Sequence, residues 1–178
     1  MASDALQALY AGNVDEAKRL LPPDSELSVF DAAAFGRIDR LRTILEEDAS
    51  RANALSSDGF TPLHLACYAE QEGAARVLIE HGADVNVRST GSIARVPPLG
   101  TAAFVRSARV ARLLLDAGAD VDGEGEGGFT ALHTAAQNGD QELVRLLLER
   151  GADPGHAMAD GRRPADLATS DAIRNALS

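Results

Sequence analysis

The feature that most constrains this chain is a short segment that occurs twice, with a fainter copy in between. The run TPLHLA at Thr61–Ala66 returns as TALHTA at Thr130–Ala135. A second motif, Gly-Ala-Asp, begins at Gly82, Gly118 and Gly151. The last two glycines are 33 residues apart and the first two are 36 apart, the same unit with three residues inserted. A fixed period of this length predicts a repeat solenoid, a class of protein that usually binds and rarely catalyses.

Each repeating unit contains the signals for two helices. Thr61 can cap a helix with its hydroxyl, and Pro62 suits the first helical position because the amide it lacks would be unpaired there. A second helix follows with apolar residues at Val77, Leu78 and Ile79. The glycine after this run can adopt the left-handed conformation that ends a helix, so a turn should separate one unit from the next.

These motifs and this period resemble ankyrin repeats, and the resemblance covers almost the whole chain. It implies an all-α ankyrin-repeat solenoid of helix-turn-helix units with short β-turn or hairpin fingers. We expect one domain over residues 1–178, with weak end repeats whose outer flanks face water. The expected repeats cover residues 1–24, 25–56, 57–89, 90–125 and 126–158, followed by a partial C-terminal cap at residues 159–178.

Composition limits the kinds of partner. A formal net charge of −10 argues against a nucleic-acid binder, which needs clustered Lys or Arg, and favours a protein partner with a basic surface. The sequence contains neither a secretory leader pattern nor 18 consecutive apolar residues, so we expect no membrane contact and a cytoplasmic protein, monomeric on its own. One cysteine fits a reducing compartment. Arg outnumbers Lys sixteen to one, which suggests a bacterial genome of high GC content.

Motifs that could carry chemistry have simpler explanations here. Residues 123–128 satisfy GxGxxG, but no strand is expected before them and two glutamates would repel a pyrophosphate, so we predict a turn between repeats. His64 and Cys67 could form a nucleophilic pair, yet both fall at packed positions of the repeat. His81, Asp84 and His156 lack the spacing of metal ligands. We therefore expect no enzyme activity, cofactor or metal.

The aromatic residues suggest where a partner binds. In ankyrin repeats, the position before the Thr of TPLH and those seven and eight after it face the concave groove, and six of the seven aromatics fall at such positions. Aromatic side chains are common interface anchors. The alternative, that several rings pack between neighbouring helices, remains open. The predicted partner-binding groove, with Arg106 at its rim, consists of Phe35, Phe60, Tyr68, Ile93, Val96, Phe104, Val105, Arg106 and Phe129.

The fourth repeat departs furthest from the pattern. Residues 97–100, Pro-Pro-Leu-Gly, stand in place of TPLH, so both the Thr cap and the His contact should be lost. Residues 89–96 lengthen the preceding finger. Arg106 in this repeat and Glu70 in the third repeat occupy the position where glycine usually joins the two helices. These changes reflect either drift or a surface adapted to one partner.

The sequence thus predicts a non-catalytic scaffold for protein–protein interaction, most simply a regulator that masks one partner. A secreted effector that binds a host protein is a second version. An enzyme with a site near His64 and Cys67 is the competing class, and self-association through the groove is a third possibility.

Overall fold

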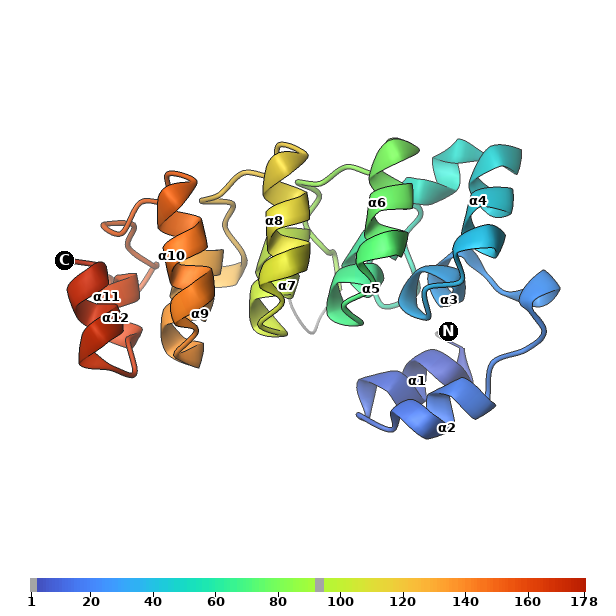
Figure 1. Cartoon of the computed structure of the whole chain (residues 1–178), viewed down its shortest axis with the longest axis horizontal. Helices are drawn as coiled ribbons and strands as arrows, with labels where there is room; N and C mark the ends of the chain where they lie inside the picture. Colours follow the sequence, from blue (N-terminus) through green and yellow to red (C-terminus); the bar gives the residue numbers. More distant parts are fainter. Residues whose placement is uncertain (1–2, 92–94) are drawn as a thin grey trace. The chain divides into compact units, whose positions relative to one another are not determined.

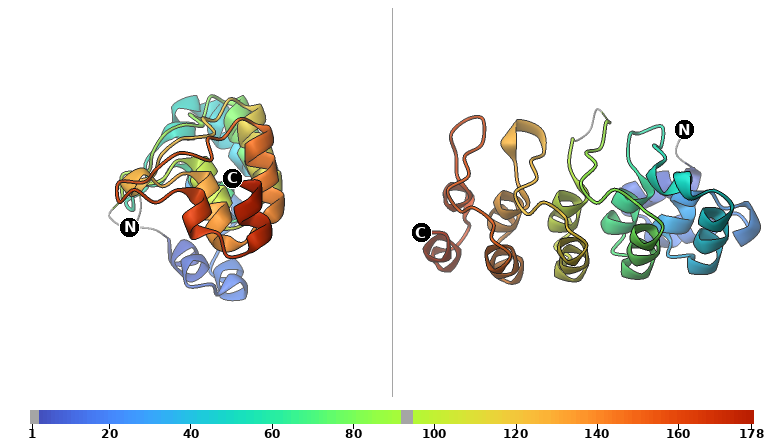
Figure 2. Two further views of the ribbon diagram at one scale, coloured as in Figure 1. Left: turned by 90° about the vertical axis from the view of Figure 1, so that its left-hand side faces the viewer. Right: turned by 90° about the horizontal axis from the view of Figure 1, so that it is seen from above.

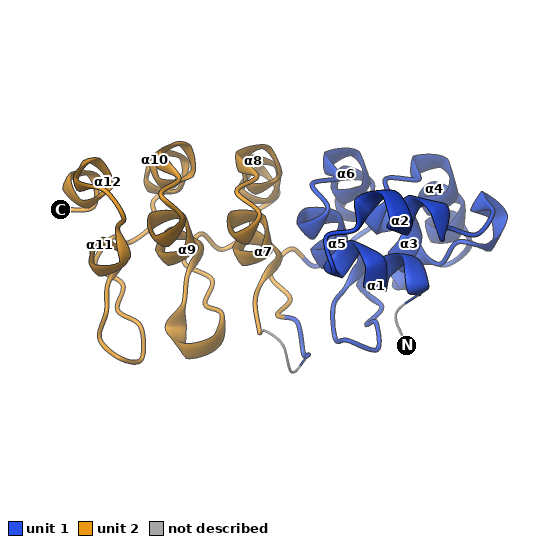
Figure 3. Cartoon of the chain, turned by 90° about the horizontal axis from the view of Figure 1, so that it is seen from below, with its two compact units in different colours: residues 1–84, 89–93 blue, residues 85–88, 94–178 orange. Residues whose placement is uncertain are grey.

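The computed structural model describes residues 3–91 and 95–178, which fold into helices without any β-strand (Figure 1). Contacts divide the chain into two compact units. Unit 1 comprises residues 1–84 and 89–93, and unit 2 comprises residues 85–88 and 94–178 (Figure 3). The all-α prediction is confirmed. The prediction that the whole chain forms one domain with the stated repeat boundaries stays a prediction.

Unit 1 contains two regular helix pairs and one irregular pair. The regular pairs are α3 (Val29–Ala34) with α4 (Ile38–Glu47), and α5 (Pro62–Tyr68) with α6 (Glu72–Glu80). A 3-10 helix, η2 (Ala49–Asn53), lies between them. The irregular pair is α1 (Asp4–Tyr10) with α2 (Val14–Arg19), and the 3-10 helix η1 (Asp24–Glu26) connects it to α3.

Unit 2 repeats the same arrangement three times, and its successive pairs lie side by side (Figure 2). The pairs are α7 (Pro98–Phe104) with α8 (Ala108–Asp116), α9 (Ala131–Asn138) with α10 (Gln141–Glu149), and α11 (Pro164–Leu167) with α12 (Asp171–Ala176). The 3-10 helix η3 (Glu126–Gly128) lies in the finger before α9. Short α11 and α12 correspond to the predicted C-terminal cap.

The repeated Thr and His residues form the capping arrangement that their spacing predicts. The Thr61 hydroxyl accepts a hydrogen bond from the backbone amide of His64 at 3.4 Å, and it lies 2.8 Å from His64 Nδ1. Thr130 and His133 reproduce this geometry at the start of α9, with Nδ1 2.9 Å from the hydroxyl. Both histidines are fully buried, so they are structural parts of the helix start.

Glycines end the second helices as expected, and polar fingers connect successive repeats. Gly118 has a φ of +89°, which is the left-handed region that a side chain disfavours. Its carbonyl accepts a hydrogen bond from the Asn86 side chain, whose oxygen in turn accepts from the Asp120 amide at 2.8 Å. Asn53 joins Gly82 and Asp84 in unit 1 in the same way. At these two junctions, a single amide side chain thus links neighbouring repeats.

The fourth repeat has the predicted irregularities. Pro97 occupies the N-cap position of α7 and provides no side-chain cap, and the hydroxyl of buried Thr101 has no hydrogen-bond partner among the described residues. Arg106 adopts φ = +60°, and Glu70, at the same position of the third repeat, adopts φ = +55°, which confirms that these residues stand where glycine would be less strained. The inserted finger includes residues 92–94, which lie outside the described residues.

The N-terminal pair departs from the regular pattern. In unit 1, α1 packs against the first helices of the next two repeats, α3 and α5, and α2 packs chiefly against α1 (Figures 1 and 3). The segment between α2 and α3, residues 20–28, is much shorter than residues 48–61, which form the finger between α4 and α5. Because residues 20–28 are too short to form a finger, the α1–α2 pair is not joined to the next repeat as the regular repeats are joined.

Candidate partner-binding surface

The nine residues of the predicted groove differ widely in exposure. Phe104 is the most exposed large apolar side chain of the described residues, at 66% of its full area. Arg106 is also exposed. Partial burial is shared by Phe35, Phe60, Tyr68, Val96, Val105 and Phe129. Ile93 lies outside the described residues, so its place stays a prediction.

In unit 2, Phe104 ends α7 and is held by the following repeat. The Asn138 side-chain amide donates to the carbonyl of Ala103 at 3.3 Å and to that of Phe104 at 3.4 Å. Arg106 lies 3.9 Å from Asp140, the residue that caps α10. Since the backbone around the ring is tied to α9, the ring is presented on a fixed support while remaining open to solvent.

Phe129 lies at the base of a finger in unit 2 and has a different environment. Its ring lies 5.4 Å from that of His133, and its carbonyl accepts a hydrogen bond from the amide of Gly125 at 2.7 Å. This half-buried ring therefore supports the start of α9, in agreement with the alternative that some of the aromatics pack between helices and fingers.

In unit 1 the predicted groove residues lie against α1. Leu6, Ala34 and Leu65, from α1, α3 and α5, form one buried cluster. Five partly buried side chains pack against this cluster: Leu9, Tyr10, Phe30, Phe35 and Phe60. The Tyr10 and Tyr68 rings meet edge to face, with centroids 5.8 Å apart. The predicted groove positions of these repeats are thus already in contact with another part of the chain.

Sequence reasoning placed the first 24 residues in a weak terminal repeat and did not predict that α1 packs against α3 and α5. Two signals pointed to it. The connection to α3 contains Pro22 and Pro23 and is too short for a finger, and α1 carries apolar residues at Leu6, Leu9 and Tyr10, the spacing of one helical face. Neither signal identifies the helices against which that face packs, because any apolar surface of the right shape would serve.

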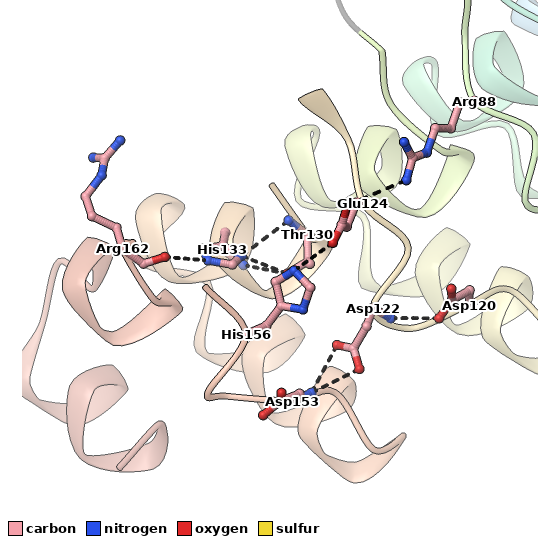
Figure 4. Close-up of polar contacts among 9 residues, drawn as sticks. All are labelled: Arg88, Asp120, Asp122, Glu124, Thr130, His133, Asp153, His156 and Arg162. Atoms are coloured by element: carbon pink, nitrogen blue, oxygen red, sulfur yellow. Dashed lines mark hydrogen bonds and ion pairs between the residues drawn. The ribbon is translucent and has the colours of Figure 1, made fainter. Parts of the chain in front are cut away.

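The acid and base groups of the unit 2 fingers bind one another (Figure 4). Glu124, in the glycine-rich segment, lies 3.9 Å from Arg88 and 3.2 Å from Nε2 of His156, within ion-pair distance though not aligned as a hydrogen bond. Asp122 accepts from the amide of Asp153 at 3.0 Å. This segment forms a finger as predicted, and its carboxylates link successive repeats.

Two hollows in unit 2 differ in chemistry. A polar one of about 320 Å³ lies at the base of the fingers, lined by Asn86, Arg88, Pro97, Asp120, Asp122, Gly123 and Glu124. A mainly apolar one of about 310 Å³ lies between α10 and α12 and includes Val144, Leu148 and Ile173. Both are open at the surface, and neither contains the exposed Phe104.

The two residues considered as a nucleophilic pair lack access to solvent. His64 and Cys67 are both fully buried in α5, and burial raises the pKa of the Cys67 thiol well above its usual range, so the reactive thiolate is disfavoured. Within residues 3–91 and 95–178, no three His, Cys, Asp or Glu side chains are grouped so that they could hold a metal ion. No helix in that part of the chain combines the length and apolar character needed to cross a membrane.

Comparison with known proteins agrees with these observations. A model of ankyrin repeats, in three copies, matches residues 4–89 and 94–158. This chain belongs to the ankyrin repeat family. Ankyrin repeats generally mediate protein–protein interaction and are generally non-catalytic.

The relatives are larger proteins. Human BCL-6 corepressor-like protein 1 is 27% identical over 165 residues, 92% of this chain and 7% of that protein. Rat ankyrin repeat and SAM domain-containing protein 6 is 36% identical over 153 residues, 86% of this chain and 13% of the relative. Human tRNA endonuclease ANKZF1 is 49% identical over 51 residues, 29% of this chain and 7% of that protein. These mammalian relatives lend no support to the composition-based prediction of a bacterial source.

Proposed function

We propose that this chain is a non-catalytic binding module that regulates or masks a partner protein, with Phe104 as its anchor. The single observation that carries the proposal is the 66% exposure of this ring in a fold that generally binds proteins. An exposed aromatic side chain offers a large apolar area at little cost in rotamer entropy, which is why such residues dominate binding interfaces.

The support beneath Phe104 favours binding without rearrangement. Asn138 fixes the carbonyl of Phe104 itself, so the end of α7 is already ordered before a partner arrives. A preformed anchor lowers the ordering cost of association. Val105 and Arg106 follow on the same turn, and we propose that they extend the contact, with Arg106 at the rim.

We propose a partner surface that places basic residues around an apolar pocket. The net charge of −10 attracts such a surface over long distances and repels nucleic-acid phosphates. We also propose a cytoplasmic, monomeric protein, in line with a reduced and buried Cys67.

Replacement of Phe104 tests the proposal. Proteins captured from extracts of the native cell by the wild-type chain are identified, and the affinity of each purified candidate is then measured by calorimetry. Phe104→Asp should weaken binding at least about 100-fold, as expected for a hot-spot residue, while the thermal midpoint stays within about 2 °C.

Leu55→Asp provides the matched control. Leu55 is also an exposed apolar side chain, at 51%, but it lies in the segment between η2 and α5 and outside the predicted groove. Its replacement should leave binding unchanged. Equal binding by wild-type and Phe104→Asp chains would disprove the anchor, and a large loss of stability in Phe104→Asp would instead assign the ring to the core.

A further inference from the structure

Unit 1 provides evidence about a second binding surface, because part of the chain already occupies it. We define the α1-binding face as Ala34 and Phe35 of the α3 end, Phe60, and Leu65 and Tyr68 of α5. Leu6, 2% exposed, is buried in the cluster with Ala34 and Leu65. The contact extends from Ser3, whose hydroxyl donates to Asp31, to the Tyr10–Tyr68 ring pair.

The occupant contacts the rest of unit 1 mainly through α1. The second helix, α2, packs chiefly against α1. Its Ala17 is fully buried, whereas Val14 is 46% exposed and Leu20, just after the helix, is 42% exposed. The pair α1–α2 is thus a small hairpin with its own contact surface, and it rests on the α1-binding face mainly through α1.

The regular repeats have caps that do not depend on this hairpin. The Ser28 hydroxyl accepts from the backbone amide of Asp31 at 3.1 Å and donates to the Asp31 carboxylate at 2.5 Å. Asp31 would keep this partner if Ser3 moved away. Because α3 starts with a local cap, departure of the hairpin would leave the beginning of the stack intact.

The fit of α1 on the face is incomplete. The hydroxyl of Tyr10 is buried and has no hydrogen-bond partner among the described residues. Burial raises the pKa of Tyr10 to about 12, with smaller contributions from the nearby Asp58 and Asp31 carboxylates. A buried polar group without a partner opposes the docked state, since water satisfies that group when the hairpin leaves.

We propose that the α1-binding face binds an amphipathic helix of a partner protein, and that α1 is a replaceable internal occupant of that site. The partner helix presents apolar side chains at positions i, i+3 and i+4, as α1 does with Leu6, Leu9 and Tyr10. This inference rests on the proposed function in being a protein-binding role, but it concerns a different surface from Phe104.

The internal occupant also sets the affinity for the partner. Only molecules with the hairpin released can bind, so the apparent affinity is reduced by the fraction released. The connection through residues 20–28 holds the hairpin close, at an effective concentration in the millimolar range. Release by any change in the chain should therefore strengthen partner binding.

A peptide of residues 3–28, labelled with fluorescein, serves as the probe, and its binding to full-length chains is followed by fluorescence anisotropy. Leu6→Asp places a charge in the buried cluster and should release the internal hairpin. This variant should bind the peptide at least 10-fold more tightly than the wild type. The control Val14→Asp, on the exposed side of α2, should bind as the wild type does, and a peptide carrying Leu6→Asp should not bind.

Hydrogen exchange on the wild-type chain tests the same inference without any mutation. Amides of α1 and α2 should exchange before those of α3 and α5. Simultaneous exchange of all four helices would overturn the proposal, because α1 would then belong to the cooperative core. A folded Leu6→Asp chain that binds the peptide no better than the wild type would also overturn it.

The Phe104→Asp substitution makes it possible to distinguish failure of this proposal from failure of the proposed function. Added to Leu6→Asp, it should leave peptide binding unchanged, since the probe addresses unit 1. Failure of Phe104→Asp to affect the captured partner would count against the proposed anchor alone, and failure of the peptide experiment would count against the α1-binding face alone.

Discussion

The two units place aromatic residues of the same repeat positions in different environments. In unit 1, Phe35, Phe60 and Tyr68 are partly buried. Phe35 and Phe60 pack against the cluster that contains Leu6 of α1, and the ring of Tyr68 meets that of Tyr10. In unit 2, Phe104 occupies the position equivalent to Tyr68 but is 66% exposed. A repeat position therefore fixes the direction of a side chain without fixing its exposure, because an additional element can cover one copy and leave another open.

Charge is distributed unequally as well. Of the 27 Asp and Glu residues, 15 lie in unit 1, together with only 7 of the 17 Lys and Arg residues. Unit 1 thus has most of the net charge of −10, while unit 2 is close to neutral. Long-range attraction of a basic partner should come mainly from unit 1, and the open apolar anchor belongs to unit 2.

The largest expected effect tests whether the units share one cooperative core. Leu78 and Leu114 occupy equivalent positions before Gly82 and Gly118, and both are fully buried. Each Leu→Ala replacement should cost about 2–5 kcal/mol through the cavity it leaves. Urea unfolding gives the loss, and hydrogen exchange should show faster opening mainly in the mutated unit. Equal acceleration in both units would indicate a single cooperative domain.

Within unit 2, the capped fifth repeat can be compared with the uncapped fourth. Thr130→Ala should cost about 1 kcal/mol, because it removes the hydroxyl that accepts from the amide of His133. Conversely, Pro97→Thr should recover up to about 1 kcal/mol by providing the absent cap. Thermal unfolding measures both changes.

The same difference in helix capping predicts the order in which the repeats open and exchange their amide hydrogens. The fourth repeat should exchange its amide hydrogens before the third and the fifth in the wild type, and Pro97→Thr should slow its exchange. Uniform protection across the three repeats would contradict the idea that the missing cap weakens this unit.

The hairpin of unit 1 should be released at alkaline pH. No such response is expected at Phe104, whose side chain does not ionise. Docking raises the pKa of Tyr10 from the ordinary value near 10 to about 12, so the docked state holds the phenolic proton more tightly than the released state. The contribution of this proton to docking is complete below about pH 10 and disappears as the pH rises towards about 12.

NMR of the Leu6 methyl groups can follow this release, since Leu6 does not ionise and is only 2% exposed in the docked hairpin. These signals should move to their released positions as the pH rises from about 10 to 12. In Tyr10→Phe, docking should be at least as strong as in the wild type, because an unpaired hydroxyl is removed, and the Leu6 signals should stay at their docked positions in this range. Unchanged wild-type signals would show that Tyr10 ionises without release.

The smallest expected effects concern the turn between paired helices. Glu70 in unit 1 and Arg106 in unit 2 both have positive φ angles, so replacement by glycine relieves strain, but it also increases the entropy of the unfolded chain. Each variant should gain at most about 1 kcal/mol. Arg106→Gly should gain less, because it also removes the ion pair with Asp140. Calorimetric thermal midpoints can resolve this order.

Local motifs made much of the fold predictable. Thr61 with His64 and Thr130 with His133 specify helix starts through contacts three residues apart, and Gly118 specifies a helix end through its own backbone freedom. The weak start of α7 followed from the same reasoning, since Pro97 lacks the hydroxyl that the other repeats use. These features depend on neighbours in the chain, and so they can be read from a single sequence.

The candidate site was predictable only in part. Phe104 was identified from its place in the repeat, but the sequence did not distinguish its exposure from that of Phe60 or Tyr68. The difference depends on α1, which is more than 50 residues away from α5 in the sequence. Packing between distant segments follows shape and apolar area, which the spacing of residues does not reveal.

The sequence by itself determined the repeating helix pairs, their caps and turns, and the absence of the usual cap in the fourth repeat, because each depends on hydrogen bonds or backbone angles within a few residues. Only the tertiary structure decided which apolar side chains face solvent. It placed Leu6 of the N-terminal hairpin over α3 and α5 and left Phe104 open, since burial depends on every segment that comes to lie above a surface.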